Sequence, residues 1–225
     1  MFQTINNYFY HNVVADYLAY LETRKSKPFG SSHDLRAALA AATSLYHFRE
    51  HLPTSHRLSR DEASLRCSDY GIIQDVTNAA KHRLLTKGNP QFRRAEDIFE
   101  LLVTVQYEDG TGTYFDTDKI VVIRLEDGSE LDLPEALTNV INFWGSFLVD
   151  IGARSTYKPF PRIERPGEKY VLRDKARRVD MEMVRGLAFR GGIRPMSFNP
   201  ALGHAEPVDL KQFSEARMNV RSRRL

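Results

Sequence analysis

Four stretches of the chain repeat their apolar residues at steps of three and four, which places those residues on one face of an α-helix. Proline and glycine separate the stretches, and Pro53 ends the second one. Ser59 and Glu62 have the spacing of a capping box, which marks a further helix start. The pattern predicts four main helices, running approximately from Ile5 to Arg24, Ser32 to Leu52, Asp69 to Leu85 and Leu133 to Ile151.

Between the third and fourth helices the apolar period changes from that of a helix to that of a strand. Leu101–Tyr107 and Lys119–Leu125 are rich in β-branched and aromatic residues, as strands are. Asp127-Gly128 is a strong hairpin signal and leads to a third strand at Ser129–Leu133. The sequence therefore predicts a three-stranded antiparallel β-meander within about residues 101–133.

These elements predict a mainly α fold of the α+β class, in which a four-helix bundle carries the β-meander as an insertion before its last helix. We expect the bundle to occupy residues 1–152, because proline and glycine become frequent after Gly152. Residues 153–225 then form a C-terminal extension, within which Leu172 to Arg185 has the pattern of a basic helix.

The formal net charge of +3 is the sum of two unlike parts. Residues 1–150 carry 15 Lys and Arg against 21 Asp and Glu, whereas residues 151–225 carry 17 against 8. An acidic body with a basic C-terminal segment suggests that the segment meets an acidic partner. The alternative is a solvated tail, or a tail folded back onto the acidic body.

Membrane and extracellular classes are disfavoured by the composition. No window approaches the ~18 consecutive apolar residues of a membrane helix. Polar residues such as Asn6, Asn7 and His11 stand where a signal peptide would need an apolar stretch. Cys67 is the single cysteine, which excludes an internal disulfide and a cysteine-based zinc site and fits a reducing compartment. We expect a cytoplasmic protein.

The third helix carries an unusual polar stripe. At 100° per residue, Gly71, Asp75, Asn78 and His82 fall within about 60° of one another, beside the apolar face. His82 could act as a general base that Asp75 and Asn78 orient. The alternative is a buried polar network that fixes how the helices pack.

His47 and His51 lie four residues apart near the end of the second helix, a spacing that permits metal binding. The spacing marks no third ligand, and a solvated helix end is the simpler interpretation. We therefore expect neither a metal ion nor a cofactor. If the second and third helices pack together, His47 could face the polar stripe.

Arginines cluster near the C-terminus and resemble the residues that contact phosphate groups: Arg177, Arg178, Arg221, Arg223 and Arg224. Few aromatic residues are interleaved with them, which favours sequence-independent electrostatics over base stacking. RNA or another polyanion is the expected partner of this segment. A protein partner or a second copy of the chain is the alternative.

The pattern Asp75-x-x-Asn78-x-x-Lys81-His82 resembles a recurring helix of uncharacterised bacterial and phage proteins. In those proteins it precedes a small sheet and a final helix with a Phe-Trp pair, here Phe143-Trp144. More distantly, the chain is similar to the HEPN superfamily (higher eukaryotes and prokaryotes nucleotide-binding), helical bundles common in defence and toxin systems. The resemblance implies a polar site at Asp75, Asn78 and His82, with Lys81 as a phosphate contact.

Active HEPN members are metal-independent ribonucleases with an Arg, four to six further residues and a His on one helix. The position eight before His82 is Gln74, and Pro53 interrupts the residues between Arg49 and His56, so this motif is missing or degenerate. We expect a non-enzymatic or degenerate HEPN-like module that binds RNA, a nucleotide or a protein partner in a bacterial or phage conflict system. The alternative is a ribonuclease, a toxin or defence effector, that uses His82.

Overall fold

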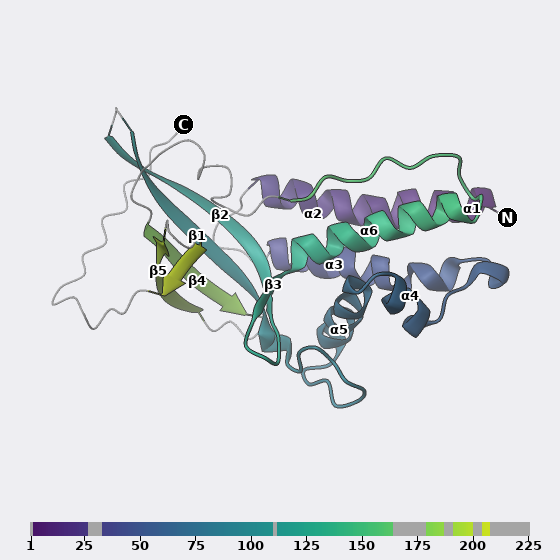
Figure 1. Cartoon of the computed structure of the whole chain (residues 1–225), viewed down its shortest axis with the longest axis horizontal. Coiled ribbons are helices and arrows are strands. Elements are labelled where there is room, and N and C mark those ends of the chain that lie inside the picture. The colour runs from purple at the N-terminus through teal and green to yellow at the C-terminus, as the bar shows by residue number, and fades with distance from the viewer. Residues whose placement is uncertain are drawn as a thin grey trace.

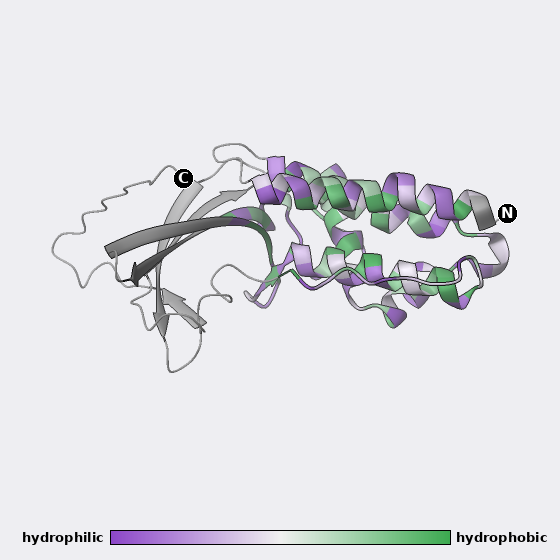
Figure 2. Cartoon of the chain, turned by 90° about the horizontal axis from the view of Figure 1, so that it is seen from above, coloured by the Kyte–Doolittle hydropathy of each residue, from purple (hydrophilic) through white to green (hydrophobic). Residues whose placement is uncertain are grey.

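The helices gather at one end of the molecule and the antiparallel sheet at the other (Figure 1). The computed structural model describes residues 2–26, 33–109, 112–163, 179–186, 191–199 and 204–207. Each helix carries both hydrophobic and hydrophilic residues, as amphipathic helices that share a core do (Figure 2). The α+β class is therefore confirmed. Within the described ranges, no helix has the length and apolar character needed to cross a membrane.

The N-terminal helical run is longer than its apolar pattern indicates. It consists of α1 (Phe2–Tyr8), a π-helical segment η1 (Phe9–Val14) and α2 (Ala15–Ser26). Phe9, Val13 and Tyr17 are fully buried at steps of four, and they face the following helices. The predicted first helix is thus confirmed, with extra residues at both ends.

The second helix, α3 (His33–His47), passes into the 3-10 turn η2 (Phe48–His51) and ends before Pro53, as its sequence predicts. After the short turn η3 (Thr54–His56), α4 (Arg60–Arg66) begins with both hydrogen bonds of the capping box. Glu62 Oε2 accepts from the Ser59 backbone N–H at 2.7 Å, and Ser59 Oγ accepts from the Glu62 N–H at 3.2 Å.

The third main helix, α5 (Asp69–Lys81), ends earlier than predicted. His82 has extended backbone angles, and the chain turns instead of continuing as a helix to Leu85. The Leu85 N–H then donates to the Arg93 carbonyl at 2.8 Å, and both Leu85 and Phe92 are buried. The pairing of Leu85 with Arg93 forms a backbone hydrogen bond and buries apolar side chains, and both would be lost if the helix continued to Leu85.

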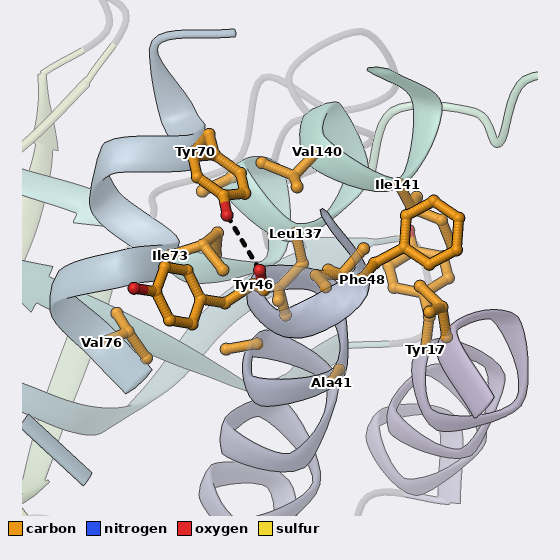
Figure 3. Close-up of a cluster of buried hydrophobic side chains, with 14 of the residues drawn as sticks. Tyr17, Ala41, Tyr46, Phe48, Tyr70, Ile73, Val76, Leu137, Val140 and Ile141 are labelled. Carbon is orange, nitrogen blue, oxygen red and sulfur yellow. Dashed lines mark hydrogen bonds between the residues drawn. The ribbon is translucent and has the colours of Figure 1, made fainter. Parts of the chain in front are cut away.

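The last main helix, α6 (Leu133–Asp150), begins with Pro134 in its first turn and packs against α3 and α5. Trp144 is fully buried, and its Nε1 donates to the Leu45 carbonyl at 3.0 Å. Figure 3 shows the apolar core between these helices, with Leu137, Val140 and Ile141 of α6 facing the end of α3.

The predicted β-meander is confirmed as β1 (Ile98–Asp109), β2 (Gly112–Arg124) and β3 (Glu130–Asp132), all antiparallel. Gly128 has a φ of +84° in the turn before β3, a conformation that glycine adopts without strain. The sheet is larger than predicted, because the C-terminal segment adds three strands to its β1 edge. The order is β3-β2-β1-β4-β5-β6.

The three added strands are β4 (Val179–Gly186), β5 (Gly191–Asn199) and β6 (His204–Pro207). The prediction of a basic helix from Leu172 to Arg185 is wrong over Val179–Arg185, which is strand, with Asp180–Arg185 paired with β1. Apolar and acidic residues alternate in this stretch, and the free edge of β1 satisfies its backbone groups. Residues 172–178 lie outside the described ranges.

Residues 151–163, which we call the strap, run back along α6 (Figure 1). Asn142 holds the strap by two hydrogen bonds with the backbone of Phe160, 2.8 and 2.9 Å long, and a third from the Tyr157 hydroxyl. Gly145 leaves room for Tyr157, since a Cβ at Gly145 would lie 2.2 Å from the Tyr157 ring. The division of the chain into residues 1–152 and 153–225 stays a prediction.

A buried group of three charges joins the helices to the sheet. Lys119 Nζ of β2 lies 2.7 Å from Asp34 of α3 and 3.4 Å from Glu100 of β1. Glu100 also accepts the Leu35 backbone N–H at 3.1 Å. All three charged side chains are buried, so the ion pairs hold the first turn of α3 against the sheet.

Candidate functional site

The structure keeps Gly71, Asp75 and Asn78 of the polar stripe on α5 but places His82 just after the last residue of that helix. Asp75 is buried, with 7 % of its surface exposed, whereas Asn78 is half-buried and His82 is exposed. Because α5 ends at Lys81, the helical spacing does not extend to His82. The His82 backbone N–H donates to the Asn78 carbonyl at 2.9 Å, but in the described ranges no hydrogen bond or ion pair joins the His82 ring to the side chain of Asp75 or Asn78.

Asp75 instead anchors the loop that follows α5. Its Oδ2 accepts the Gln91 backbone N–H at 2.8 Å, and the Gln91 carbonyl accepts the Glu126 N–H at 2.9 Å. Burial raises the pKa of Asp75, and the hydrogen bond from Gln91 offsets part of that rise. This contact favours the packing interpretation for Asp75.

The loop of residues 82–94, which we call the basic loop, is closed like a hairpin. Besides the Leu85 hydrogen bond, the Ala95 N–H donates to the Arg83 carbonyl at 3.1 Å. Leu85, Pro90 and Phe92 are buried beneath it. Together with Lys81, the basic loop exposes a set of basic side chains that we call the basic surface: Lys81, His82, Arg83, Lys87, Arg93 and Arg94.

Two members of the basic surface are neutralised. Arg83 Nε lies 3.0 Å from Glu96, and Arg93 pairs with Glu126. For Lys81, Lys87 and Arg94, the described part of the chain offers no carboxylate within ion-pair distance. These three cations are therefore available to an external anion.

His47, at the end of α3, contacts Lys81, at the end of α5. Lys81 Nζ lies 3.5 Å from His47 Nε2, although the two residues are 34 positions apart. On the other side of the ring, His47 Nδ1 lies 3.2 Å from Glu50 Oε2. The structure thus brings together two predicted binding residues and adds an acidic residue that the sequence analysis did not single out.

Two guanidinium groups flank the neighbouring Tyr46. The Arg49 and Arg60 guanidinium carbons lie 5.7 and 5.8 Å from the centre of its ring, within the range of cation–π attraction. Tyr70 donates to the Tyr46 carbonyl at 2.8 Å, as Figure 3 shows, and burial raises the pKa of Tyr70. Sequence reasoning missed Arg60, although its position directly after the Ser59 cap marked it as the first residue of a helix.

His51 does not join His47 in a metal site. Its ring stacks on Tyr8, with the ring centres 3.7 Å apart. Over the described ranges, no three His, Cys, Asp or Glu side chains lie together in a way that could hold a metal ion. Cys67 is partly buried, and burial raises the pKa of its thiol, which fits a packing role better than a nucleophilic one.

The predicted C-terminal contacts lie outside the described residues: Arg177, Arg178, Arg221, Arg223 and Arg224. No protein-family model, curated protein or solved structure matches this chain.

Proposed function

We propose that this chain is a non-enzymatic module that binds RNA, and that the phosphate backbone lies on the basic surface. The single observation that carries the proposal is an ordered loop that exposes cations. Five Lys and Arg residues lie within residues 81–94, and Lys81, Lys87 and Arg94 have no carboxylate partner in the described ranges. Cations that neutralise phosphates release counterions, which favours binding without sequence preference.

The order of the basic loop supports the proposal on energetic grounds. Buried Leu85 and Phe92, the backbone hydrogen bonds and the Asp75–Gln91 contact hold the loop in one conformation. A loop that is already ordered loses less conformational entropy when a ligand binds. The basic C-terminal segment, if it binds the same RNA, adds further phosphate contacts.

Binding is favoured over catalysis because a general base needs a partner that orients it. Asp75 contacts the Gln91 backbone, and His82 has no hydrogen bond to it in the described ranges. A metal-independent ribonuclease that uses His82 remains the second candidate. It is supported by the exposure of His82 next to Lys81 and by the HEPN resemblance, which would also place the protein in a bacterial or phage conflict system.

The proposal is tested by the affinity of the full chain for a fluorescent single-stranded RNA, measured by anisotropy at low salt. We expect the double charge reversal Lys87→Glu with Arg94→Glu to weaken binding at least tenfold, because two phosphate contacts become repulsive. Lys158→Glu on the strap is the matched control, since Figure 1 places the strap across the bundle from the basic loop.

An absence of RNA binding at low salt, or an equal affinity of the double variant, would overturn the proposal. The same samples, analysed for cleavage products, decide between the two candidates. RNA cleavage that disappears in His82→Ala would establish the ribonuclease in place of the binding module.

A further inference from the structure

The groups on the two sides of the His47 ring favour one tautomer. Glu50 carries only acceptors when ionised, and its negative charge, 3.2 Å from His47 Nδ1, favours the tautomer with the proton on Nδ1. In the neutral ring, Nε2 then carries the lone pair and accepts a hydrogen bond from the Lys81 ammonium at 3.5 Å. Neutral His47 therefore directs Lys81 toward α3.

Protonation of His47 reverses this arrangement. Nε2 becomes a donor and can no longer accept from Lys81, and two cationic nitrogens then lie 3.5 Å apart. Like charges at that separation repel each other unless an anion lies between them. An oxygen of a phosphate group, which accepts from both nitrogens, is the ligand that this pair would take.

We propose that His47 and Lys81 form a phosphate-binding subsite that is switched on by protonation of His47. The inference rests on the proposed function for the identity of the ligand, a phosphodiester of the RNA backbone. His47 has 30 % of its side chain exposed, so both protons and phosphate oxygens reach the ring from solvent.

The charged groups around His47 are consistent with anion binding after protonation. Arg49 on its own segment and Arg60 on α4 lie over Tyr46, whose ring contacts His47. Lys81 faces the ring from α5, and Glu50, which also forms an ion pair with Arg49 at 3.2 Å, lies beside Nδ1 of the ring. Nearby, Arg57 is bound to the backbone carbonyls of Glu50 and Leu52, and His51 is stacked on Tyr8. Protonation thus adds a positive charge to a group in which cations outnumber acids.

The affinity for RNA should accordingly rise as the pH falls through the range in which imidazoles change charge, between about pH 5 and pH 8. We expect binding of a uridine oligonucleotide, whose bases do not ionise in this range, to tighten about fivefold or more between those limits at constant salt. In His47→Gln the response should be reduced to less than about twofold. His11→Gln, on the exposed side of η1, is the matched control and should retain the full response.

A full pH response in His47→Gln would overturn the inference. If the pH response is lost in His82→Gln and retained in His47→Gln, the inference is also overturned, and the switch is assigned to His82. Binding of RNA at every pH with no pH response also overturns it while leaving the proposed function intact.

A second measurement does not depend on RNA. Nitrogen-15 NMR of the imidazole rings in the full chain reports the tautomer of His47 and its response to inorganic pyrophosphate. We expect the proton of the neutral ring on Nδ1, and a pyrophosphate-dependent shift of Nε2 that is lost in Lys81→Met. A neutral ring protonated on Nε2, or no shift with pyrophosphate, contradicts the inference even if the chain binds RNA.

Discussion

The buried carboxylate of Asp75 on α5 accepts the backbone N–H of Gln91, 16 positions further along the chain, and so anchors the basic loop. The sequence suggested that Asp75 orients His82. In the structure, Asp75 instead holds the basic loop, which carries the cations. The basic surface depends on this contact, because the hydrogen bond to Asp75 and the buried apolar residues of the basic loop together hold the loop in place.

Two replacements of Asp75 should separate the stabilising effect of its hydrogen bond with Gln91 from the cost of burying its charge. Asp75→Ala removes the acceptor of the Gln91 N–H and should lower the free energy of unfolding by about 1–3 kcal/mol. Asp75→Asn keeps an acceptor and removes the cost of a buried charge, so at neutral pH it should be at least as stable as the natural chain. Urea unfolding of both variants measures these differences.

The pH dependence of Asp75→Asn follows from the direction of the shift. Burial raises the pKa of Asp75 in the folded state, so the folded chain binds this proton more tightly than the unfolded chain does. The stabilisation from that proton is fully present below the unfolded pKa and is lost as the pH rises through the folded pKa. Any advantage of Asp75→Asn should therefore shrink on acidification. An advantage that grows toward low pH would show that the carboxylate is stabilised in the fold.

The ion pairs of Lys119 predict a large loss of stability for Lys119→Met, which leaves Asp34 and Glu100 buried without their ammonium partner. Removing one partner of a buried pair costs about 3–5 kcal/mol. Arg83→Met is the matched control, since it breaks an exposed pair with Glu96 whose loss costs about 0–1 kcal/mol. Equal losses of stability in the two variants, measured by urea unfolding, would contradict the role of the buried ion pairs of Lys119 in joining α3 to the sheet.

Gly145→Ala should detach the strap from α6. Its Cβ would lie 2.2 Å from the ring of Tyr157, so the ring must move, at a cost of about 1–3 kcal/mol. Burial raises the pKa of Tyr157 to about 12, and displacement of the ring into water should lower it. Gly71→Ala on α5 is the control, because its nearest contact is a glutamine side chain at 3.4 Å. Ultraviolet titration and urea unfolding report both effects.

Limited proteolysis tests the division of the chain. The shift in charge and in proline and glycine content after Gly152 predicts a resistant core that ends within residues 152–165. The packing of the strap against Asn142 favours an end near residue 163, whereas the pairing of β4 with β1 favours protection of Asp180–Gly186 as well. If the C-terminal 60 residues resist as strongly as the helical part of the chain, the two-part organisation is wrong.

Local signals predicted much of the fold. The capping box of Ser59 and Glu62, the hairpin turn at Gly128 and the apolar face of α6 around Trp144 all depend on neighbours within a few residues, and all are found in the structure. Long-range pairing accounts for the differences. The end of α5 at Lys81 depends on the return of Arg93 to Leu85, and the strand β4 depends on the free edge of β1.

The site was predicted only in part for the same reason. The sequence suggested that His47 could face the third helix if the two helices pack together, but its contact with Lys81 depends on how α3 and α5 pack. The Gln91 partner of Asp75 is a backbone N–H, which no side-chain pattern reveals. Lys119 follows Asp116 and Asp118 and begins the strand predicted from the sequence, so its burial between two carboxylates could not be inferred from residue type.

The salt dependence of RNA binding tests the central claim most directly. For single-stranded nucleic acid, each neutralised phosphate contributes about −0.7 to the slope of log affinity against log salt concentration. We predict a steep slope for the full chain and a slope about 1.4 units shallower for Lys87→Ala with Arg94→Ala, since two phosphate contacts are lost. The Lys158→Ala control should keep the slope of the natural chain. An unchanged slope in the double variant, or RNA binding that does not respond to salt, would contradict the assignment of the basic surface.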